Sequence, residues 1–102
     1  MGAETPLEIP LLAFFTDSRS GPGRRMESQL AHLAHKERGR LRVQRVDVER
    51  HPELAERLCV EAVPTLLLVR EGRVVGRLEG RVSAPRIERL LEQHLDVLAG
   101  AA

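Results

Sequence analysis

The sequence predicts an α/β fold in which strands and helices alternate along one small domain. Short apolar runs at residues 11–16 and 66–69 are typical of buried strands. Apolar residues recur at helical spacing over residues 24–38, and again toward the end of the chain. A Glu-Gly pair at 71–72 separates two strand-like runs, which is typical of a tight antiparallel hairpin. These patterns give the order strand–helix–strand–helix–strand–strand–helix.

The chain has 102 residues, enough for one domain with a core, and we assign that domain to residues 1–102. We expect residues 1–9 and 99–102 to be poorly ordered tails. The first strand is expected at residues 11–16, where the apolar run is too short to cross a membrane.

A polar turn at residues 20–23 (Ser-Gly-Pro-Gly) leads from this strand into a helix predicted over residues 24–38. Proline suits a first helical turn, because its missing N–H would have no partner inside the helix. The apolar face of this helix is formed by Met26, Leu30, Leu33 and Ala34. Gly39 then ends the helix as a left-handed cap would.

The second strand is expected over residues 41–48, and its alternation of apolar and polar residues slips between Val43 and Val46. Such a slip predicts either a β-bulge or a change of the face that is buried. Pro52 then suits the first turn of a short helix. The apolar positions of that helix are Leu54, Ala55, Leu58 and Cys59.

The last two strands, at residues 66–69 and 73–78, are predicted to be antiparallel because only two residues join them. A final helix is expected to begin at Ser83 as its cap, with Pro85 in its first turn. The inner face of this helix is formed by Ile87, Leu90, Leu91, Leu95 and Leu98.

Composition argues against several classes of function. The 16 basic and 15 acidic residues nearly cancel, and there are two Phe and no Trp or Tyr, so we expect no nucleic-acid binding. No apolar run reaches membrane length, and no N-terminal targeting pattern is present. The single cysteine cannot form an internal disulfide, which fits a reducing compartment, and we expect a cytoplasmic protein. Abundant Arg, Ala, Gly and Leu beside one lysine suggest a bacterial source.

Four short segments resemble the thioredoxin family. Residues 19–24 (Arg-Ser-Gly-Pro-Gly-Arg) correspond to the family's Trp-Cys-Gly-Pro-Cys-Lys, and the likeness runs without a gap from about Leu11 to Pro64. The other segments are Asp47-Val48-Glu49 with Pro52, Val63-Pro64-Thr65, and Gly80. The resemblance implies a central sheet with helices on both faces and a cis bond before Pro64. The first strand of the family has no counterpart here, so we expect four strands, with residues 41–48 at an edge.

The resemblance also shows what this chain lacks. Ser20 and Gly23 stand where the family has its two cysteines. Phe14 replaces the buried Asp that assists proton transfer in the family, and Thr16 and Arg19 replace its two tryptophans. Disulfide exchange needs an attacking thiolate and a second thiol that resolves the mixed disulfide. We therefore expect a redox-inactive relative of thioredoxin, without a cofactor or a metal.

In the family, a groove beside the cis-proline holds an extended peptide. Its counterparts here are Arg19, Val63, Pro64, Thr65 and Gly80, next to the degenerate redox motif Ser20, Gly21, Pro22 and Gly23. The resemblance implies binding of a protein or peptide partner there, in an assembly or chaperone-like role. A groove that persists only because the fold needs its glycines and proline is the competing interpretation. The alternative function is a thioredoxin-type oxidoreductase of cell redox homeostasis that works weakly through Cys59.

Other candidate residues have two interpretations each. Ser20 is either a nucleophile or a helix cap. Arg24 and Arg25 either bind an anion at the helix start or are solvated. His32 and His35 lie one turn apart, but two ligands do not make a metal site. Cys59 is expected to be buried and inert. A homodimer through the edge strand at 41–48 is a further expectation.

Overall fold

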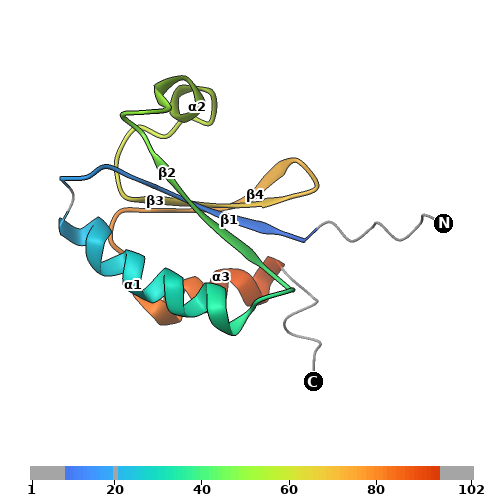
Figure 1. The fold of residues 1–102 in the computed structure, drawn as a ribbon. Helices are drawn as coiled ribbons and strands as arrows, with labels where there is room; N and C mark the ends of the chain where they lie inside the picture. Colours follow the sequence, from blue (N-terminus) through green and yellow to red (C-terminus); the bar gives the residue numbers. More distant parts are fainter. Residues whose placement is uncertain (1–8, 20, 95–102) are drawn as a thin grey trace.

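The computed structural model describes residues 9–19 and 21–94 (Figure 1). The elements are β1 (Leu11–Thr16), α1 (Gly21–Lys36), β2 (Arg42–Asp47), α2 (Pro52–Arg57), β3 (Thr65–Arg70), β4 (Arg73–Glu79) and α3 (Ala84–His94). Their order confirms the predicted one. Helix α1 begins three residues earlier than predicted, at Gly21, and so takes Pro22 into its first turn. None of the described helices is long and apolar enough to cross a membrane.

The described strands form one mixed sheet in the order β2-β1-β3-β4. Strand β1 runs parallel to β2 and antiparallel to β3, and β3 runs antiparallel to β4. The expectation that Leu11–Thr16 is the first of four strands, with the second strand at an edge, holds for the described part of the chain.

Each face of the sheet has its own core. Figure 1 shows α1 and α3 together on one face and α2 on the other. Because side chains alternate along a strand, β1 supplies Leu12 and Phe14 to the α1–α3 face and Ala13 and Phe15 to the α2 face. All four are buried, which explains why β1 reads as a continuous apolar run.

The slip of pattern in β2 is a change of face and not a bulge. Leu41 and Val43 pack in the α1–α3 core, whereas Val46 and Val48 pack in the α2 core. The pairing with β1 is unbroken from Leu11–Arg42 to Thr16–Asp47. The register shift lies instead between β3 and β4, at Leu68/Val69.

The β3–β4 hairpin turns through Glu71 and Gly72, whose φ angles are 53° and 78°. Positive φ at both central residues belongs to the type I′ turn, whose twist matches that of the flanking strands. Gly39, which follows α1, also has a positive φ of 89° as expected. Of the predicted inner face of the last helix, Ile87, Leu90 and Leu91 are buried. Leu95 and Leu98 lie outside the described residues, as do residues 1–8 and 99–102 of the predicted tails.

Gly76 in β4 allows α3 to pack closely on the sheet. A Cβ added at this position would lie 2.6 Å from Leu90 Cδ1, and Leu90 is buried. We expect Gly76→Ala to lower the free energy of unfolding by about 1 to 2 kcal/mol, and Gly76→Val to lower it further. Urea denaturation of both variants measures this. A Gly76→Val variant as stable as the wild type would contradict the close packing.

Candidate functional site

Three loops meet at one end of the sheet, where strands begin or finish. Phe15 near the end of β1 pairs with Thr65 at the start of β3, and Thr65 pairs with Glu79 at the end of β4. The turn before α1, the turn at residues 62–64 and Gly80 therefore lie at the same end of the sheet. This end includes the carboxyl end of β1, and ligands usually bind at the carboxyl ends of strands in α/β proteins.

The cis-proline turn is held from both sides. The Val63–Pro64 bond is cis, as the resemblance implied. Thr65 is buried, and its Oγ1 donates a hydrogen bond to the Ala62 carbonyl oxygen at 2.7 Å. The Gly80 N–H donates to the Pro64 carbonyl oxygen at 2.8 Å. These bonds fix the backbone of the turn against the end of β4.

The backbone around this turn leaves room for another chain. Gly80 has a φ of 81°, and a Cβ built there meets no atom within 4 Å. In the hydrogen bonds between described residues, the backbone N–H and C=O groups of Val63 have no partner. A neighbouring extended segment could pair with such backbone groups as a strand pairs at a sheet edge.

The degenerate motif lies beside this turn. Arg19 is exposed, and its N–H donates to Asp17 Oδ1 at 2.9 Å, which shapes the end of the loop. Gly21, Pro22 and Gly23 form the start of α1. Ser20 lies outside the described residues, so its role as nucleophile or cap stays a prediction.

Phe14 fills the position of the family's buried acid with an aromatic ring. Its side chain is 1% exposed and packs in the α1–α3 core with Leu12 and Leu66. No carboxyl group is therefore present at this position to exchange a proton with a thiol. The change removes one part of the family's chemistry and adds apolar packing in its place.

The expectation for Cys59 is wrong: its side chain is exposed, not buried. Helix α2 ends at Arg57, and the chain turns at Cys59, whose φ is 59°. This left-handed turn removes Cys59 from the helical face that its spacing from Leu54 and Ala55 suggested. Val60 packs against the α2 core instead.

Arg77 of β4 holds the turn at Cys59 in place. Its guanidinium donates to the Leu58 carbonyl oxygen at 2.6 Å and to the Cys59 carbonyl oxygen at 3.2 Å. The backbone next to the thiol is therefore tied to the sheet. Only the side chain of Cys59 is left toward solvent.

The remaining predicted candidates lie on α1, and all of them are exposed: Arg24, Arg25, His32 and His35. Nowhere in the described ranges do three or more His, Cys, Asp or Glu side chains come together as metal ligands would. Arg25, however, lines an open hollow with Arg81, just past Gly80. Sequence reasoning missed Arg81, because only the fold brings the residue after Gly80 beside the first turns of α1.

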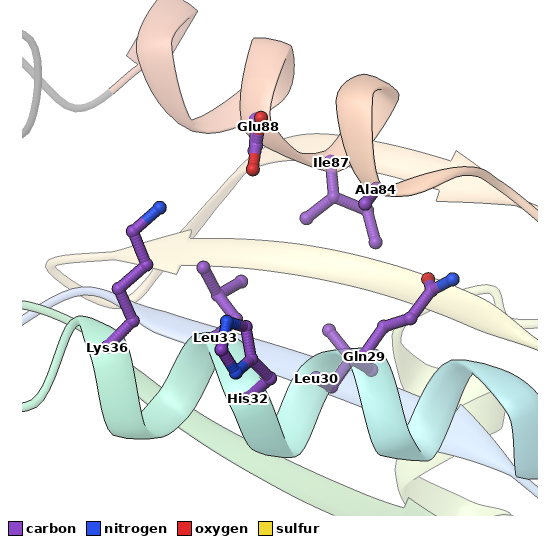
Figure 2. A pocket seen from close by; sticks show the side chains of 8 residues that line it. All are labelled: Gln29, Leu30, His32, Leu33, Lys36, Ala84, Ile87 and Glu88. Atoms are coloured by element: carbon purple, nitrogen blue, oxygen red, sulfur yellow. The ribbon is translucent and has the colours of Figure 1, made fainter.

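A second hollow, of about 150 Å³, lies between α1 and α3. Figure 2 shows Leu30 and Leu33 of α1 facing Ala84 and Ile87 of α3 across it. Lys36 lies at one end and Gln29 at the other. Gln29 also lines the hollow at Arg25 and Arg81, so the two hollows are neighbours.

Comparison with known proteins gives one consistent result. The family model described as Thioredoxin matches residues 7–93. A thioredoxin-like protein of Synechocystis is 30% identical over 89 residues, which are 87% of this chain and 82% of that protein. Thioredoxin 1 of Nostoc is 26% identical over 88 residues, with 86% and 82% covered. The crystal structure of the germline-specific thioredoxin Deadhead of Drosophila melanogaster superposes with a TM-score of 0.79 at 25% identity, and the match covers 85% of this chain and 82% of that one.

Proposed function

Because the chain belongs to the thioredoxin family, we propose that it is a non-catalytic, redox-inactive domain that binds a protein or peptide partner. The partner binds in the groove formed by Arg19, Val63, Pro64, Thr65 and Gly80. The role is that of an assembly factor or chaperone-like module in the cytoplasm of a bacterium.

The observation that carries this proposal is the contrast within one site. The backbone parts that receive a peptide are present: the cis bond before Pro64, the hydrogen bond from Gly80 to Pro64, and the open space at Gly80. The reactive parts are replaced, since the sequence has Ser20, Gly23 and Phe14 in their positions. Binding by backbone hydrogen bonds needs the former group and not the latter.

The proposal is tested by affinity capture of the tagged protein from its own cells, followed by mass spectrometry. We expect one stoichiometric companion that remains bound in dithiothreitol. A companion that dithiothreitol releases would point to a mixed disulfide through Cys59. The absence of any specific companion would leave the groove as a feature that only the fold requires.

A second candidate function, a weak thioredoxin-type oxidoreductase, is favoured by the exposure of Cys59. A lone thiol can form a mixed disulfide, but a second thiol must come from elsewhere to resolve it. We expect the purified protein to reduce insulin disulfides no faster than the dithiothreitol background, and Cys59→Ser to leave that rate unchanged. A rate above background that Cys59→Ser abolishes would favour the oxidoreductase.

A second copy of the chain is a further candidate partner. Strand β2 lies at the edge of the described sheet, with Arg42, Gln44 and Arg45 exposed along it. Arg45 pairs with Glu27 of α1. The proposed homodimer would pair the two edges over residues 41–48. Light scattering distinguishes the dimer from the monomer.

A further inference from the structure

The hollow at Arg25 and Arg81 lies just past Gly80, at the end of the proposed groove. Its lining comprises Arg25 of α1, Arg81 of the loop between β4 and α3, the buried Met26 and Val82, and Gln29 and Ser83. No acidic side chain is among the described residues that line it. The lining of the hollow is therefore positively charged and partly apolar.

Neither of these two arginines pairs with an acidic side chain among residues 9–19 and 21–94. The ion pairs between described residues use Arg40, Arg45 and Arg77, and neither Arg25 nor Arg81 is among them. Both side chains are exposed. A guanidinium binds a carboxylate through two parallel hydrogen bonds, and two guanidiniums in one hollow favour a carboxylate-bearing side chain.

The neighbouring hollow between α1 and α3 is lined largely by apolar side chains, so it favours an apolar side chain of the partner. It begins at Gln29, which both hollows share, and its floor is formed by Leu30, Leu33 and Ile87. The distance along α1 from Arg25 to Leu33 is about 12 Å, at about 1.5 Å per residue. An extended segment covers this distance in about three to four residues, at about 3.3 Å each.

We propose that the partner segment carries an acidic side chain that binds between Arg25 and Arg81, and an apolar side chain, about three residues away, that fills the hollow between α1 and α3. This inference rests on the proposed function, because it specifies the chemistry of the partner. A partner segment that is bound at the cis-proline turn and extends past Gly80 would next meet Arg81, the residue that follows Gly80 in this sequence. Inorganic phosphate would satisfy the arginines but leave the apolar hollow empty.

The test measures fluorescence anisotropy of short fluorescein-labelled peptides with the purified protein. The probe carries two glutamates and, about three residues away, a leucine; it is made in both chain orders. One comparison peptide has glutamines for the glutamates, and another has serine for the leucine. We expect one order of the probe to bind, and either replacement to weaken binding about tenfold. Added salt should weaken the probe and not the glutamine peptide.

Matched variants locate the binding site. Arg25→Gln/Arg81→Gln should weaken the probe about tenfold. Arg50→Gln/Arg57→Gln, which removes the same charge near α2 on the opposite face, should not weaken it. Three results would overturn the inference. The first is an equal loss of probe binding in both double variants, and the second is no binding of the probe at all. The third is displacement of the probe by inorganic phosphate when its binding does not depend on the leucine.

Gly80→Asn separates this inference from the proposed groove. If all three peptides bind alike and Gly80→Asn abolishes binding, the groove is supported and the inference on charge fails. If the probe binds through Arg25 and Arg81 and Gly80→Asn has no effect, the inference is supported and the groove fails. Loss of the probe in Gly80→Asn and in the arginine variant supports both.

Discussion

Replacing Phe14 by aspartate, the residue that the family has in this position, should unfold or nearly unfold the domain. Phe14 is 1% exposed and packs among Leu12, Leu66 and other residues of the α1–α3 core. Loss of a buried Phe ring costs about 3 to 5 kcal/mol, and an unpaired buried polar group costs about 1 to 3 kcal/mol more. A domain of this size has only about 5 to 15 kcal/mol in total. Thermal and urea denaturation measure the loss.

The pH dependence of the stability of Phe14→Asp shows whether burial of the introduced carboxyl group contributes to the loss. The introduced carboxyl is buried, so its pKa in the folded state lies above its value of about 3.9 in the unfolded chain. The folded state then binds more protons above pH 4, and the stability of Phe14→Asp falls as the pH rises. Phe14→Asn, which has a similar shape and does not titrate, should show no such fall. A difference in stability between the two variants that does not change with pH would contradict the burial of this position.

Phe14→Leu, which keeps the core apolar, should lower the free energy of unfolding by only about 1 to 2 kcal/mol.

Restoring the two cysteines should not restore a thioredoxin. We expect Ser20→Cys/Gly23→Cys, made together with Cys59→Ser, to reduce insulin at least about a hundredfold more slowly than an ordinary thioredoxin. General acid–base catalysis contributes about a hundredfold or more, and Phe14 offers no carboxyl group for it. The tryptophans of the family motif are also replaced, by Thr16 and Arg19.

The control is a thiol titration of the same variant before and after oxidation. Loss of both thiols on oxidation shows that the disulfide forms, so that a slow rate reflects missing catalysis and not misplaced cysteines. A variant that forms the disulfide and reduces insulin at nearly the rate of an ordinary thioredoxin would contradict our account of Phe14.

Periodicity was sufficient for the order and type of the elements because each carries a strong local signal. The apolar run of β1, the Glu71-Gly72 turn and the face of α3 at Ile87, Leu90 and Leu91 depend on short stretches of sequence. The cis bond before Pro64 came from the resemblance, because local sequence alone favours trans. The slip in β2 had two explanations, and only the fold, which covers both faces of the sheet, selects between them.

The site was less predictable from sequence. The groove residues Pro64, Thr65 and Gly80 were predicted from the resemblance, but Arg81 was missed because its neighbour Arg25 lies far away in the sequence. Cys59 was placed wrongly because helical spacing continues past the residue at which α2 ends. A left-handed residue in a turn has no reliable signal when it is not glycine or asparagine.

The most direct measurement of the central claim compares two glycine variants in the affinity capture. Gly80 and Gly72 have φ angles of 81° and 78°, and a Cβ at either position meets no atom within 4 Å. Asparagine tolerates this conformation at both sites, so Gly80→Asn and Gly72→Asn should be similarly stable. Gly80 borders the groove, whereas Gly72 lies in the hairpin turn at the other end of β3 and β4. We expect Gly80→Asn to lose the companion and Gly72→Asn to retain it; retention of the companion by both variants would contradict binding through the groove.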